Sequence, residues 1–563
     1  MKFKTIGSVI FENNEYSSEY LRKYIDNIKK NLISAVNPNE CIAVIVERNQ
    51  YMLCLIMALI ESNITFLPID LELPEKRILY MLQNADIKTV ITSEKKCIGA
   101  ELNFKYLLLK SLLIDNNSNY LDTPFSEFNN PVYYLFTSGS TGNPKAVVVN
   151  VKGFFNFLES IPNIIEFYSG EKIASFTTIS FDIFFLETIL SLINGVTVVL
   201  ANKDEQSNPK KMIDLLVNHK ITILQSTPSR LKLLRMFDKN FESLRFLKIL
   251  MVGGEIFPIE LLKHLQQNLT AEIYNMYGPT ETTIWSTISN LTHKQSVDIG
   301  KPIANTHIYL LNDRKELTES DKEGEICIAG DGLSNGYYKN QELTNNNFIQ
   351  LPFEPYCKVY CTGDLGKYEN GNLFCIGRID NQVKINGYRI ELEEIEYAIR
   401  KNKLVLDSVV CYDSDNNQLV SFYISDEKID IESLIDELES ILPNYMIPSV
   451  FEKVSYFNYT PSGKTDRKAM LEAFRNKITD SEMVISSNID LQIISIIKTE
   501  LQTNKEIKVE TKLENLGLNS MKYISIIVSI EDVFEFEFEE DFLLQESFIT
   551  VQNIIDYVKE KIK

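Results

Sequence analysis

The sequence is poor in tryptophan and histidine and lacks closely paired cysteines. It contains one tryptophan, Trp285, and four histidines among its 563 residues. No two histidines stand at metal-ligand spacing, and no C-x-x-C pattern occurs among the eight cysteines. These absences exclude zinc ribbons and thioredoxin-like redox motifs. Scattered cysteines fit free thiols in a reducing compartment better than they fit a disulfide framework.

Basic charge and long apolar runs are also scarce. The chain carries 57 Lys+Arg against 77 Asp+Glu, a formal net charge of −20. Nucleic acids and anionic membranes are bound by basic surfaces, so we expect neither as a partner. The longest apolar run, Tyr51–Ile60, is about half a membrane span, and the N-terminus has no sustained apolar core. We therefore expect a soluble, cytoplasmic protein without a signal peptide.

The first 200 residues alternate patterns typical of strands and helices. Short apolar runs predict strands, and a longer run predicts a helix at Tyr51–Glu61. The predicted strands are Cys41–Glu47, Thr89–Thr92, Val132–Phe136 and Ala146–Val149. Such alternation is typical of an α/β protein with largely parallel sheets. Further on, the glycine-bounded strands Gly324–Gly330 and Gly371–Gly377 predict a smaller β-rich region, and a helix is predicted to start near Glu391.

The C-terminal part differs in character. Residues 481–563 hold 16 acidic residues and 8 lysines, a balance of 8 − 16 = −8, with one glycine and no proline. Their apolar residues recur at helical spacing. The polar stretch Asn476–Ser487 precedes them and is typical of a linker. We therefore expect a separate, small helical domain at the end of the chain.

A loop rich in glycine and hydroxyl groups follows one predicted strand. The segment Leu135–Lys145 reads LFTSGSTGNPK. Its backbone N–H groups, hydroxyls and lysine are suited to phosphate oxygens, although the Walker spacing is absent. A flexible surface turn is the alternative. The candidate phosphate-binding residues are Thr137, Ser138, Gly139, Ser140, Thr141, Gly142 and Lys145.

Two further turns carry polar side chains. The segment Asn275–Trp285 contains a Gly-Pro turn that presents Tyr277, an aromatic ring able to stack on a base. The same turn presents Thr280 and Glu281, a hydroxyl and a carboxylate suited to a phosphate and Mg²⁺. The segment Tyr360–Asp364 places a carboxylate beside a glycine, where it suits a ribose diol.

In their order along the chain, these motifs resemble those of the adenylate-forming superfamily. The segments are TSGSTGNPK, YGPTE, TGD, GRIDNQVKINGYRIE and PSGKTDR, and more narrowly they resemble adenylation domains of non-ribosomal peptide synthetases. The resemblance implies a large N-terminal α/β domain with parallel sheets and a small β-barrel region at residues 1–379. It implies a small α+β lobe at 380–475, followed by a linker at 476–487 and an all-α, four-helix carrier domain at 488–563.

The resemblance also implies a role for each motif residue. The loop Thr137–Lys145 would grip the β- and γ-phosphates of ATP, Tyr277 would stack on adenine, and Glu281 would hold Mg²⁺. Asp364 would bind the ribose, and Lys464 would reach the substrate carboxylate and the α-phosphate. The implied catalytic residues are Lys464, Glu281 and Thr137. The implied ATP/AMP site also includes Gly278, Thr280 and Arg378. Asp380 would be the hinge between the two lobes, and Gly387 would line the tunnel through which the pantetheine thiol reaches the acyl group. A carboxylate is already a nucleophile at neutral pH, so the chemistry needs no general base and fits the few histidines.

The tail contains a second motif. In LGLNSM, Asn519 and Ser520 are good helix-start residues, and a plain helix cap is one interpretation. The segment also resembles the modification site of carrier proteins, where the serine receives 4′-phosphopantetheine. This resemblance implies a phosphopantetheinyl transferase as a partner. The acidic run Glu531–Asp541 suits a helix that docks on basic partner surfaces, although it also fits a plain solvated face.

The family's substrate pocket can be aligned with this sequence. Asp182, after Phe181, matches the carboxylate that pairs with the substrate α-ammonium. The remaining wall positions are Ile183, Leu186, Gln225, Met251, Gly253, Met276, Ile284 and Trp285. This array resembles that of glycine-activating domains and departs from it mainly at Met251, where leucine is common. Trp285 with Met276, Met251 and Leu186 would fill the space that a side chain needs.

We therefore expect activation of glycine with ATP and loading of the glycyl thioester onto Ser520, for non-ribosomal peptide or related natural-product synthesis. The alternative is another small amino acid, alanine or D-alanine, loaded onto a carrier protein. Acyl-CoA formation is disfavoured by Asp182 and the fused carrier, and an inactive scaffold is disfavoured by the intact motifs. The assigned residues leave no room for a condensation or thioesterase domain, so a downstream condensing, modifying or acceptor protein is expected. The sequence leaves open whether a small helper protein is also a partner.

Overall fold

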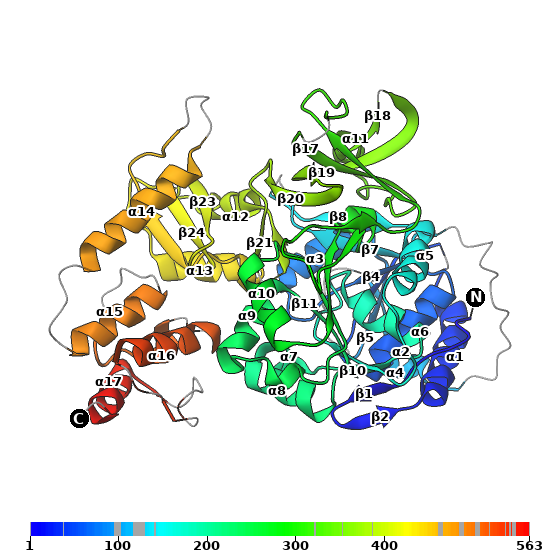
Figure 1. Ribbon diagram of the computed structural model, residues 1–563, viewed down its shortest axis with the longest axis horizontal. Coiled ribbons are helices and arrows are strands. Elements are labelled where there is room, and N and C mark those ends of the chain that lie inside the picture. Colours follow the sequence, from blue (N-terminus) through cyan, green and yellow to red (C-terminus); the bar gives the residue numbers. More distant parts are fainter. Residues whose placement is uncertain are drawn as a thin grey trace. The chain divides into compact units, whose positions relative to one another are not determined.

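The computed structural model divides into two compact units, Met1–Glu391 and Leu392–Lys563 (Figure 1). The residues that the structure describes are 2–37, 39–94, 103–115, 130–139, 142–319, 322–351, 353–385, 387–459, 465–482, 489–501, 507–516, 518, 520–534, 536, 538–539, 542 and 548–561.

The first unit is built around two large sheets. The nine-stranded sheet has the order β15-β14-β13-β12-β11-β9-β10-β1-β2, and its inner pairs from β13 to β1 are parallel. Its strands are β1 (Val9–Phe11), β2 (Asn14–Tyr16), β9 (Lys172–Ser175), β10 (Thr197–Leu200), β11 (Ile223–Ser226), β12 (Ile249–Gly253), β13 (Glu272–Tyr277), β14 (Thr287–Asn290) and β15 (Lys301–Pro302). Short apolar runs form these inner strands because both faces of a parallel sheet are covered.

The six-stranded sheet has the order β6-β5-β3-β4-β7-β8, with only the β7–β8 pair antiparallel among its described strands. Its strands are β3 (Ile42–Ile45), β4 (Phe66–Pro68), β5 (Thr89–Thr92), β6 (Lys105–Leu108), β7 (Tyr133–Thr137) and β8 (Lys145–Val149). The strands predicted from apolar runs therefore form within one or two residues of their expected bounds.

Helices cover both faces of both sheets. The described helices of this unit are α1 (Ser18–Ala35), α2 (Gln50–Glu61), α3 (Glu75–Asn84), α4 (Leu109–Leu112), α5 (Val151–Ser160), α6 (Ser191–Ile193), α7 (Lys203–Ser207), α8 (Pro209–Asn218), α9 (Pro228–Phe237), α10 (Ile259–Asn268) and α11 (Gln341–Asn347). Short 3₁₀ segments are η2 (Ile161–Asn163), η4 (Glu242–Leu244) and η5 (Thr280–Thr282), and η3 (Leu186–Leu190) is a π-helix.

The core is layered because successive strand residues face opposite sides. In β12, Met251 joins a cluster shared by both sheets and by α1, α2 and α5, whereas Leu250 joins the cluster under α8, α9 and α10. In β3, Val44 likewise faces the shared cluster, and Ala43 faces α3. The shared cluster explains why α2 is buried along nearly its whole length.

A smaller, antiparallel sheet follows the nine-stranded one in sequence. Its strands are β16 (Thr306–Leu311), β17 (Gly324–Gly330), β18 (Phe348–Leu351), β19 (Glu354–Glu369) and β20 (Asn372–Arg378). The expected strand Gly324–Gly330 forms with the bounds that its glycines predicted. A two-stranded hairpin of β21 (Val383–Ile385) and β22 (Tyr388–Ile390) ends the unit.

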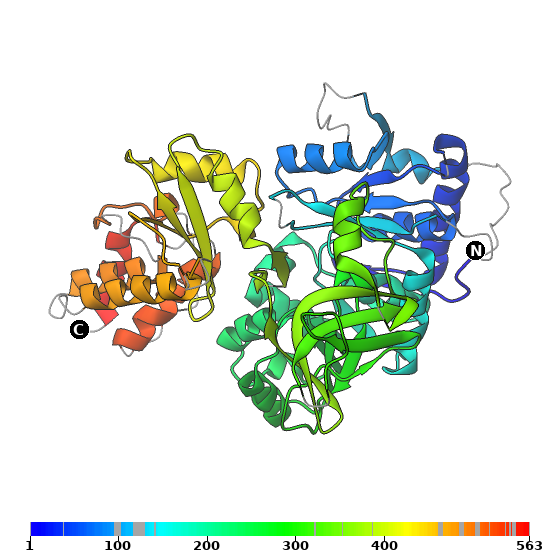
Figure 2. The ribbon, with the colours of Figure 1, turned by 90° about the horizontal axis from the view of Figure 1, so that it is seen from above.

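The second unit begins with a three-stranded sheet of β23 (Asp407–Asp413), β24 (Gln418–Ile424) and β25 (Val450–Lys453). Helices α12 (Leu392–Ile399) and α14 (Arg467–Glu482) contact β23, and α13 (Ile431–Glu439) contacts α12 (Figure 2). A short 3₁₀ helix, η6, covers Asn444–Met446. The Arg467 guanidinium donates to Glu396 at 2.7 Å and so links α14 to α12.

The remaining described elements are helical: α15 (Ile489–Leu501), the 3₁₀ helix η7 (Leu513–Leu516), α16 (Ser520–Phe534) and α17 (Val551–Lys561). We expected four helices here, and the described residues hold three α-helices and η7. Helix α14 runs on to Glu482, so residues 476–482 of the expected linker are helical. In the described part of the chain, no helix is both long and apolar enough to cross a membrane.

Candidate active site

The predicted phosphate loop joins β7 to β8, and Thr137 pairs with Lys145 across them. Gly142 has a φ of +84°, and a Cβ on Gly139 would lie 2.0 Å from the Asn143 carbonyl oxygen, so both positions need glycine. The Thr137 hydroxyl oxygen is buried without a hydrogen-bond partner among the described residues. The Lys145 ammonium lies 4.9 Å from the centre of the Tyr337 ring, and burial lowers its pKa. An unpaired hydroxyl beside a buried cation suits an anionic ligand.

Glu281 is fully buried in the middle of η5. Arg389 donates to both of its carboxylate oxygens, at 2.9 and 2.8 Å, and the Tyr337 hydroxyl donates to Oε1 at 2.8 Å. Burial alone would raise the pKa of Glu281, but Arg389 and then Lys145 outweigh it and lower the pKa to about 2. Glu281 is therefore a carboxylate whose charge is compensated by this unit's own cations.

Tyr277, Asp364 and Arg378 are brought together from three strands. The Tyr277 hydroxyl donates to Asp364 Oδ2 at 2.7 Å, and Arg378 donates to Oδ1 at 2.6 Å. Arg378 also donates to both carboxylate oxygens of Asp380, at 2.6 and 2.7 Å. The expected ribose carboxylate and the expected hinge carboxylate thus share one guanidinium.

Asp182 lies buried after a turn that starts at Thr178. Its Oδ2 has no hydrogen-bond partner in the part of the chain that the structure describes. Burial raises the pKa of Asp182 to about 6, and the Thr280 hydroxyl opposes that rise. A buried, unpaired carboxylate oxygen is costly unless a ligand supplies a donor or a cation.

The predicted wall residues converge at the carboxyl ends of the parallel strands. Gln225 pairs with Met251 across β11 and β12, and Gly253 pairs with Met276 across β12 and β13. A Cβ on Gly253 would lie 2.6 Å from Cη2 of Trp285, so the indole ring covers this glycine. The apolar wall residues belong to one buried cluster: Ile183, Leu186, Met251, Met276, Ile284 and Trp285. Leu186 begins the π-helix η3, an element that is often found at functional sites.

The turn before Trp285 has an unusual backbone. Thr283 and Ile284 have φ values of +63° and +68°, a region that β-branched residues rarely adopt. A hydrogen bond from the Thr283 hydroxyl to the Gly332 carbonyl, at 2.7 Å, anchors the turn. Gly278 fits below it, because a Cβ there would lie 2.6 Å from the Ile284 carbonyl oxygen. The strained backbone of this turn therefore positions the Trp285 indole against Gly253.

The hairpin β21–β22 places Gly387 against the nine-stranded sheet's loops. Gly387 has a φ of +84°, its N–H donates to Glu255, and a Cβ on it would lie 2.9 Å from Thr227. Next to it, the Tyr388 ring packs edge-on against Phe181, with centroids 4.8 Å apart. Gly387, the expected tunnel residue, is therefore adjacent in sequence to Tyr388, and the Tyr388 ring touches Phe181, which precedes Asp182.

Two family models match this chain. Residues 5–338 match the family model described as AMP-binding enzyme, and residues 492–558 match the model described as phosphopantetheine attachment site. The first match covers more than half of the chain. The chain belongs to the AMP-binding enzyme family.

Several relatives and solved structures extend this finding. This AMP-binding enzyme is 34% identical, over 77% of its length, to the dimodular nonribosomal peptide synthase of Bacillus subtilis (strain 168), and it spans about a fifth of that protein. The structure of PA1221, an NRPS protein containing adenylation and PCP domains, matches with a TM-score of 0.81 at 22% identity over 99% of this chain and 94% of that one. Holo-AB3403, a four-domain nonribosomal peptide synthetase bound to AMP and glycine, matches with a TM-score of 0.60 at 26% identity over 99% of this chain and 42% of that one.

These matches confirm the expected fold class, with large N-terminal sheets, a small β-barrel region, a C-terminal lobe and a helical carrier region. They also confirm the expected order of an adenylation domain followed by a carrier domain. The domain boundaries and the role of each site residue stay predictions, as does glycine as the substrate.

Some predicted residues lie outside the described part of this AMP-binding enzyme. They are Ser140, Thr141 and Lys464. Ser138 is described, and its hydroxyl donates to the Arg389 carbonyl at 2.9 Å. Ser520 begins α16, which agrees with its predicted position at a helix start.

Sequence reasoning missed three residues of the site: Arg389, Tyr337 and Lys384. Arg389 and Tyr337 bind Glu281, and Lys384 is half-buried with its charge near Asp364 and Asp182. Arg389 and Lys384 stand inside the quoted segment GRIDNQVKINGYRIE, so their motif was a signal. Nothing in the spacing shows that Arg389 reaches a glutamate 108 residues away.

The described residues do not offer Glu281 as an open ligand for Mg²⁺. Both of its oxygens accept from Arg389, and a guanidinium repels a divalent cation at the same position. Magnesium at Glu281 therefore stays a prediction, and the steps below do not depend on it. The described residues of the predicted phosphate loop suit ATP, because among them Thr137 offers a hydroxyl without a hydrogen-bond partner and Lys145 offers a cation.

Proposed function

We propose that this chain activates glycine with ATP as glycyl-AMP, releases pyrophosphate, and transfers glycine as a thioester to a 4′-phosphopantetheine arm on Ser520. The proposal is carried by a combination at the site: Asp182 Oδ2 is buried without a hydrogen-bond partner among the described residues, and the Trp285 indole covers Gly253. The family membership and the carrier match support the reaction type.

The buried Asp182 favours an amino acid over other carboxylic acids. An α-ammonium group supplies both the opposite charge and the N–H donors that Oδ2 lacks among the described residues. A fatty or aryl acid would leave that carboxylate desolvated and unpaired, which costs about 1–3 kcal/mol or more. The proposed substrate class is therefore an α-amino acid bound through Asp182.

The indole of Trp285 favours the smallest amino acid. The indole lies on Gly253 together with Met276. A substrate with a side chain would therefore have to displace a ring that packs in the buried core. Close-packed cores resist such displacement. Holo-AB3403 was solved with AMP and glycine at 26% identity, and this supports glycine here. Alanine and D-alanine, each one methyl larger, are the alternatives that the experiment below includes.

The proposed chemistry has two steps. In the first, a glycine carboxylate oxygen attacks the α-phosphorus of ATP, and the bond to pyrophosphate breaks. Asp182 orients the amino acid, Thr137 and Lys145 hold phosphate oxygens, and Asp364 with Tyr277 binds the nucleoside. Lys464 is predicted to stabilise the charge that develops on the α-phosphate.

In the second step a thiol attacks the acyl carbonyl and AMP leaves. The phosphopantetheine arm, once bound, supplies that thiol, and a phosphopantetheinyl transferase is required to attach it. Tyr388 packs against Phe181 and Gly387 lies against Thr227, and we propose that both border the thiol's approach to the acyl group. The acceptor of the glycyl group, another enzyme or domain, completes the proposed pathway, and a small helper protein is a further proposed partner.

The test is amino-acid-dependent ATP–pyrophosphate exchange with glycine, alanine, D-alanine and the other common amino acids. We expect glycine to give the highest kcat/KM. Asp182→Asn should lose exchange with every amino acid, whereas Asp313→Asn, an exposed aspartate, should match the wild type. A better rate with alanine or D-alanine would contradict glycine, and full activity of Asp182→Asn would contradict the role of Asp182.

A further inference from the structure

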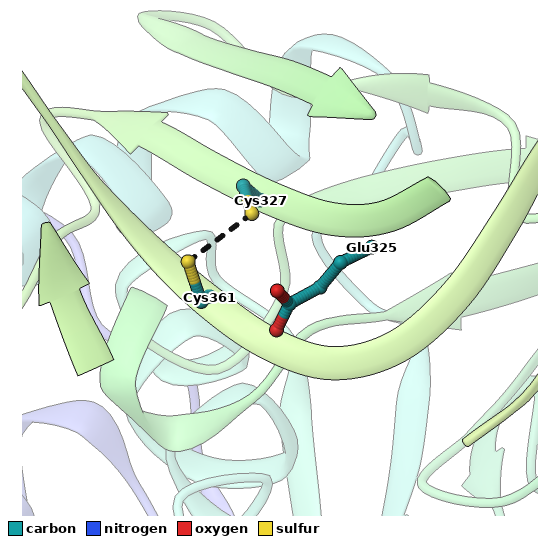
Figure 3. Close-up of side chains that lie close together, drawn as sticks. All are labelled: Glu325, Cys327 and Cys361. Atoms are coloured by element: carbon teal, nitrogen blue, oxygen red, sulfur yellow. Dashed lines mark hydrogen bonds between the residues drawn. The ribbon is translucent and has the colours of Figure 1, made fainter. Parts of the chain in front are cut away.

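Two cysteines face each other across the small antiparallel sheet. Cys327 on β17 and Cys361 on β19 are directly opposite in the strand register. The Cys327 thiol donates to the Cys361 sulfur with the two Sγ atoms 3.3 Å apart, and Figure 3 shows both sulfurs turned toward each other. Cys327 is buried and Cys361 is partly exposed. The two sulfurs are therefore close enough to form a disulfide if the two strands move slightly closer together.

A cation and a carboxylate complete this cluster. The Lys315 ammonium lies 3.9 Å from Cys361 Sγ and 2.5 Å from Glu325 Oε2. The hydrogen bond from Cys327 and, more weakly, the charge of Lys315 lower the pKa of Cys361. The Lys315 side chain is 41% exposed and Cys361 is partly exposed, so a small solute can approach the Cys361 sulfur from this side.

The cluster borders the strand irregularity that carries the expected ribose carboxylate. Glu325 pairs with Leu365 and Cys327 with Cys361, so residues 362–364 of β19 lie opposite Ile326 alone. Such bulges re-aim side chains next to functional sites. The Glu325 carboxylate accepts from the Gly363 N–H at 3.0 Å, and the Thr362 hydroxyl donates to the Ile326 carbonyl at 2.7 Å. The cysteine pair and Glu325 therefore hold the two sides of the bulge that places Asp364.

We propose that Cys327 and Cys361 form an oxidation-sensitive thiol pair, and that their disulfide shifts the bulge carrying Asp364 and weakens ATP binding. The co-reactant is a hydroperoxide. The Cys361 thiol gives up its proton to solvent, its sulfur attacks the terminal oxygen, and the O–O bond breaks. A sulfenic acid forms, and the leaving oxygen takes up a proton from solvent to depart as an alcohol or water. The Cys327 sulfur then attacks the sulfenic sulfur, the S–O bond breaks, and the departing hydroxyl takes the Cys327 proton as water. Two electrons pass from the thiols to the peroxide.

The consequence for Asp364 follows from geometry. A disulfide needs its sulfurs about 2.05 Å apart, so the strands must draw together beside the bulge. Oxidation also changes the sulfur that faces Lys315, and Lys315 is the cation that binds Glu325. Both changes act on the backbone that positions Asp364, three residues from Cys361. The effect on ATP rests on the proposed function, whereas the disulfide itself does not.

A soft divalent cation is the competing occupant. One oxygen of Glu325 and the two sulfurs lie within 4.8 Å of one another, and Figure 3 shows the carboxylate beside Cys361. However, both Glu325 oxygens are engaged, by Lys315 and by Gly363, and the ammonium already compensates the negative charge. A metal ion would have to displace that cation, so the arrangement favours a thiol pair.

The first experiment counts thiols without any activity assay. The full-length protein is titrated with hydrogen peroxide, denatured, alkylated and digested for mass spectrometry. We expect a Cys327–Cys361 disulfide and the loss of two thiols, reversed by dithiothreitol, and we expect no such bond in Cys327→Ser. Cys357→Ser, on the same strand β19, is the matched control and should oxidise like the wild type. Irreversible oxidation of Cys361 without a disulfide, or a tightly retained Zn²⁺ in the reduced protein, would overturn the proposal.

The second experiment measures ATP and glycine KM in reduced and oxidised protein. We expect oxidation to raise the ATP KM at least about threefold, with little change in the glycine KM, because sub-ångström misplacement of a binding group is costly. Cys327→Ser should show no oxidation-dependent change. An unchanged ATP KM in fully disulfide-bonded protein would contradict the coupling to Asp364. Absence of exchange in the reduced protein and in every variant would contradict the proposed function instead, while the thiol count stands by itself.

Discussion

Two buried side chains, Asp182 and Trp285, carry the proposed choice of substrate. One is a polar group that lacks a partner among the described residues, and the other is an apolar ring that fills space beside a glycine. Asp182 favours binding of a substrate that has an ammonium group, and Trp285 disfavours binding of a substrate that has a side chain. Selectivity for the smallest member of a series is attainable by steric exclusion, whereas rejecting a smaller competitor is limited to about 1–3 kcal/mol per methylene.

Replacing the tryptophan by a smaller apolar residue should relax this selection. We predict that Trp285→Leu raises the ratio of kcat/KM for alanine over glycine at least about tenfold, because the space over Gly253 opens. Exchange assays with both amino acids measure the ratio. Phe241→Leu, in a separate buried cluster, likewise replaces a buried aromatic ring by leucine and should leave the ratio unchanged. An unchanged ratio in Trp285→Leu would remove the indole from the account of specificity.

The raised pKa of Asp182, about 6, predicts an acid limb in glycine binding. Above that pH the carboxylate is charged and pairs with the substrate ammonium; below it the carboxyl is neutral and the pairing is lost. We predict that kcat/KM for glycine falls about tenfold per pH unit below pH 6, whereas the KM for ATP changes little. A pH series of exchange rates tests this, and a flat glycine profile down to about pH 5 would contradict it.

At the scale of elements, the ends of β11, β12 and β13 and the strained turn after η5 form the proposed binding wall. The strands set the positions of Gln225, Met251, Gly253 and Met276 through their register. The left-handed conformations of Thr283 and Ile284 then bring Trp285 back over β12. A wall made from rigid strands holds its shape better than one made from loops alone.

This wall leaves no room for a methyl group on Gly253. A Cβ there would lie 2.6 Å from both the Met276 carbonyl oxygen and the indole. We predict that Gly253→Ala lowers the free energy of unfolding by about 1–3 kcal/mol and lowers exchange with glycine, because the backbone and the ring must move. Gly377→Ala is the matched control, since its Cβ meets nothing within 4 Å. Equal free energies of unfolding for the two variants in denaturant titrations would contradict this prediction and show that the wall can accommodate the added methyl group.

Local sequence patterns predicted the strands well and the contacts between distant segments poorly. Gly324–Gly330 was delimited by its own glycines, and the apolar run at Thr89–Thr92 matches β5. The bulge at residues 362–364 depends on how β19 registers against β17, which no local pattern encodes. The family resemblance supplied the site residues on the described strands and turns. It did not supply Arg389 on Glu281, because that ion pair depends on where the β21–β22 hairpin docks.

At the scale of the whole molecule, activation and loading are assigned to different parts of the chain. The AMP-binding match ends at residue 338, and the attachment-site match begins at residue 492. The two activities should therefore be separable by substitution, although the complete reaction requires both parts.

We predict that Ser520→Ala retains glycine-dependent exchange within about twofold of the wild type but accepts no phosphopantetheine, since the first step needs only the adenylation domain. Conversely, Lys464→Ala should be modified normally by a phosphopantetheinyl transferase but should lose exchange at least about a hundredfold, because charge on the α-phosphate is no longer stabilised. Intact-protein mass spectrometry and exchange assays measure the two properties. Equal phosphopantetheine labelling of Ser520→Ala and the wild type would contradict the carrier assignment.

The most direct test of the central claim is a competition for the carrier site. Phosphopantetheinylated full-length protein is incubated with ATP and an equimolar mixture of all common amino acids and D-alanine. The peptide containing Ser520 is then identified by mass spectrometry together with the group that its arm carries. The account predicts glycine, bound as a thioester that hydroxylamine releases, and no glycine on the peptide when Asp182 is replaced by asparagine. A different amino acid on Ser520, or loading that persists in Asp182→Asn, would contradict it.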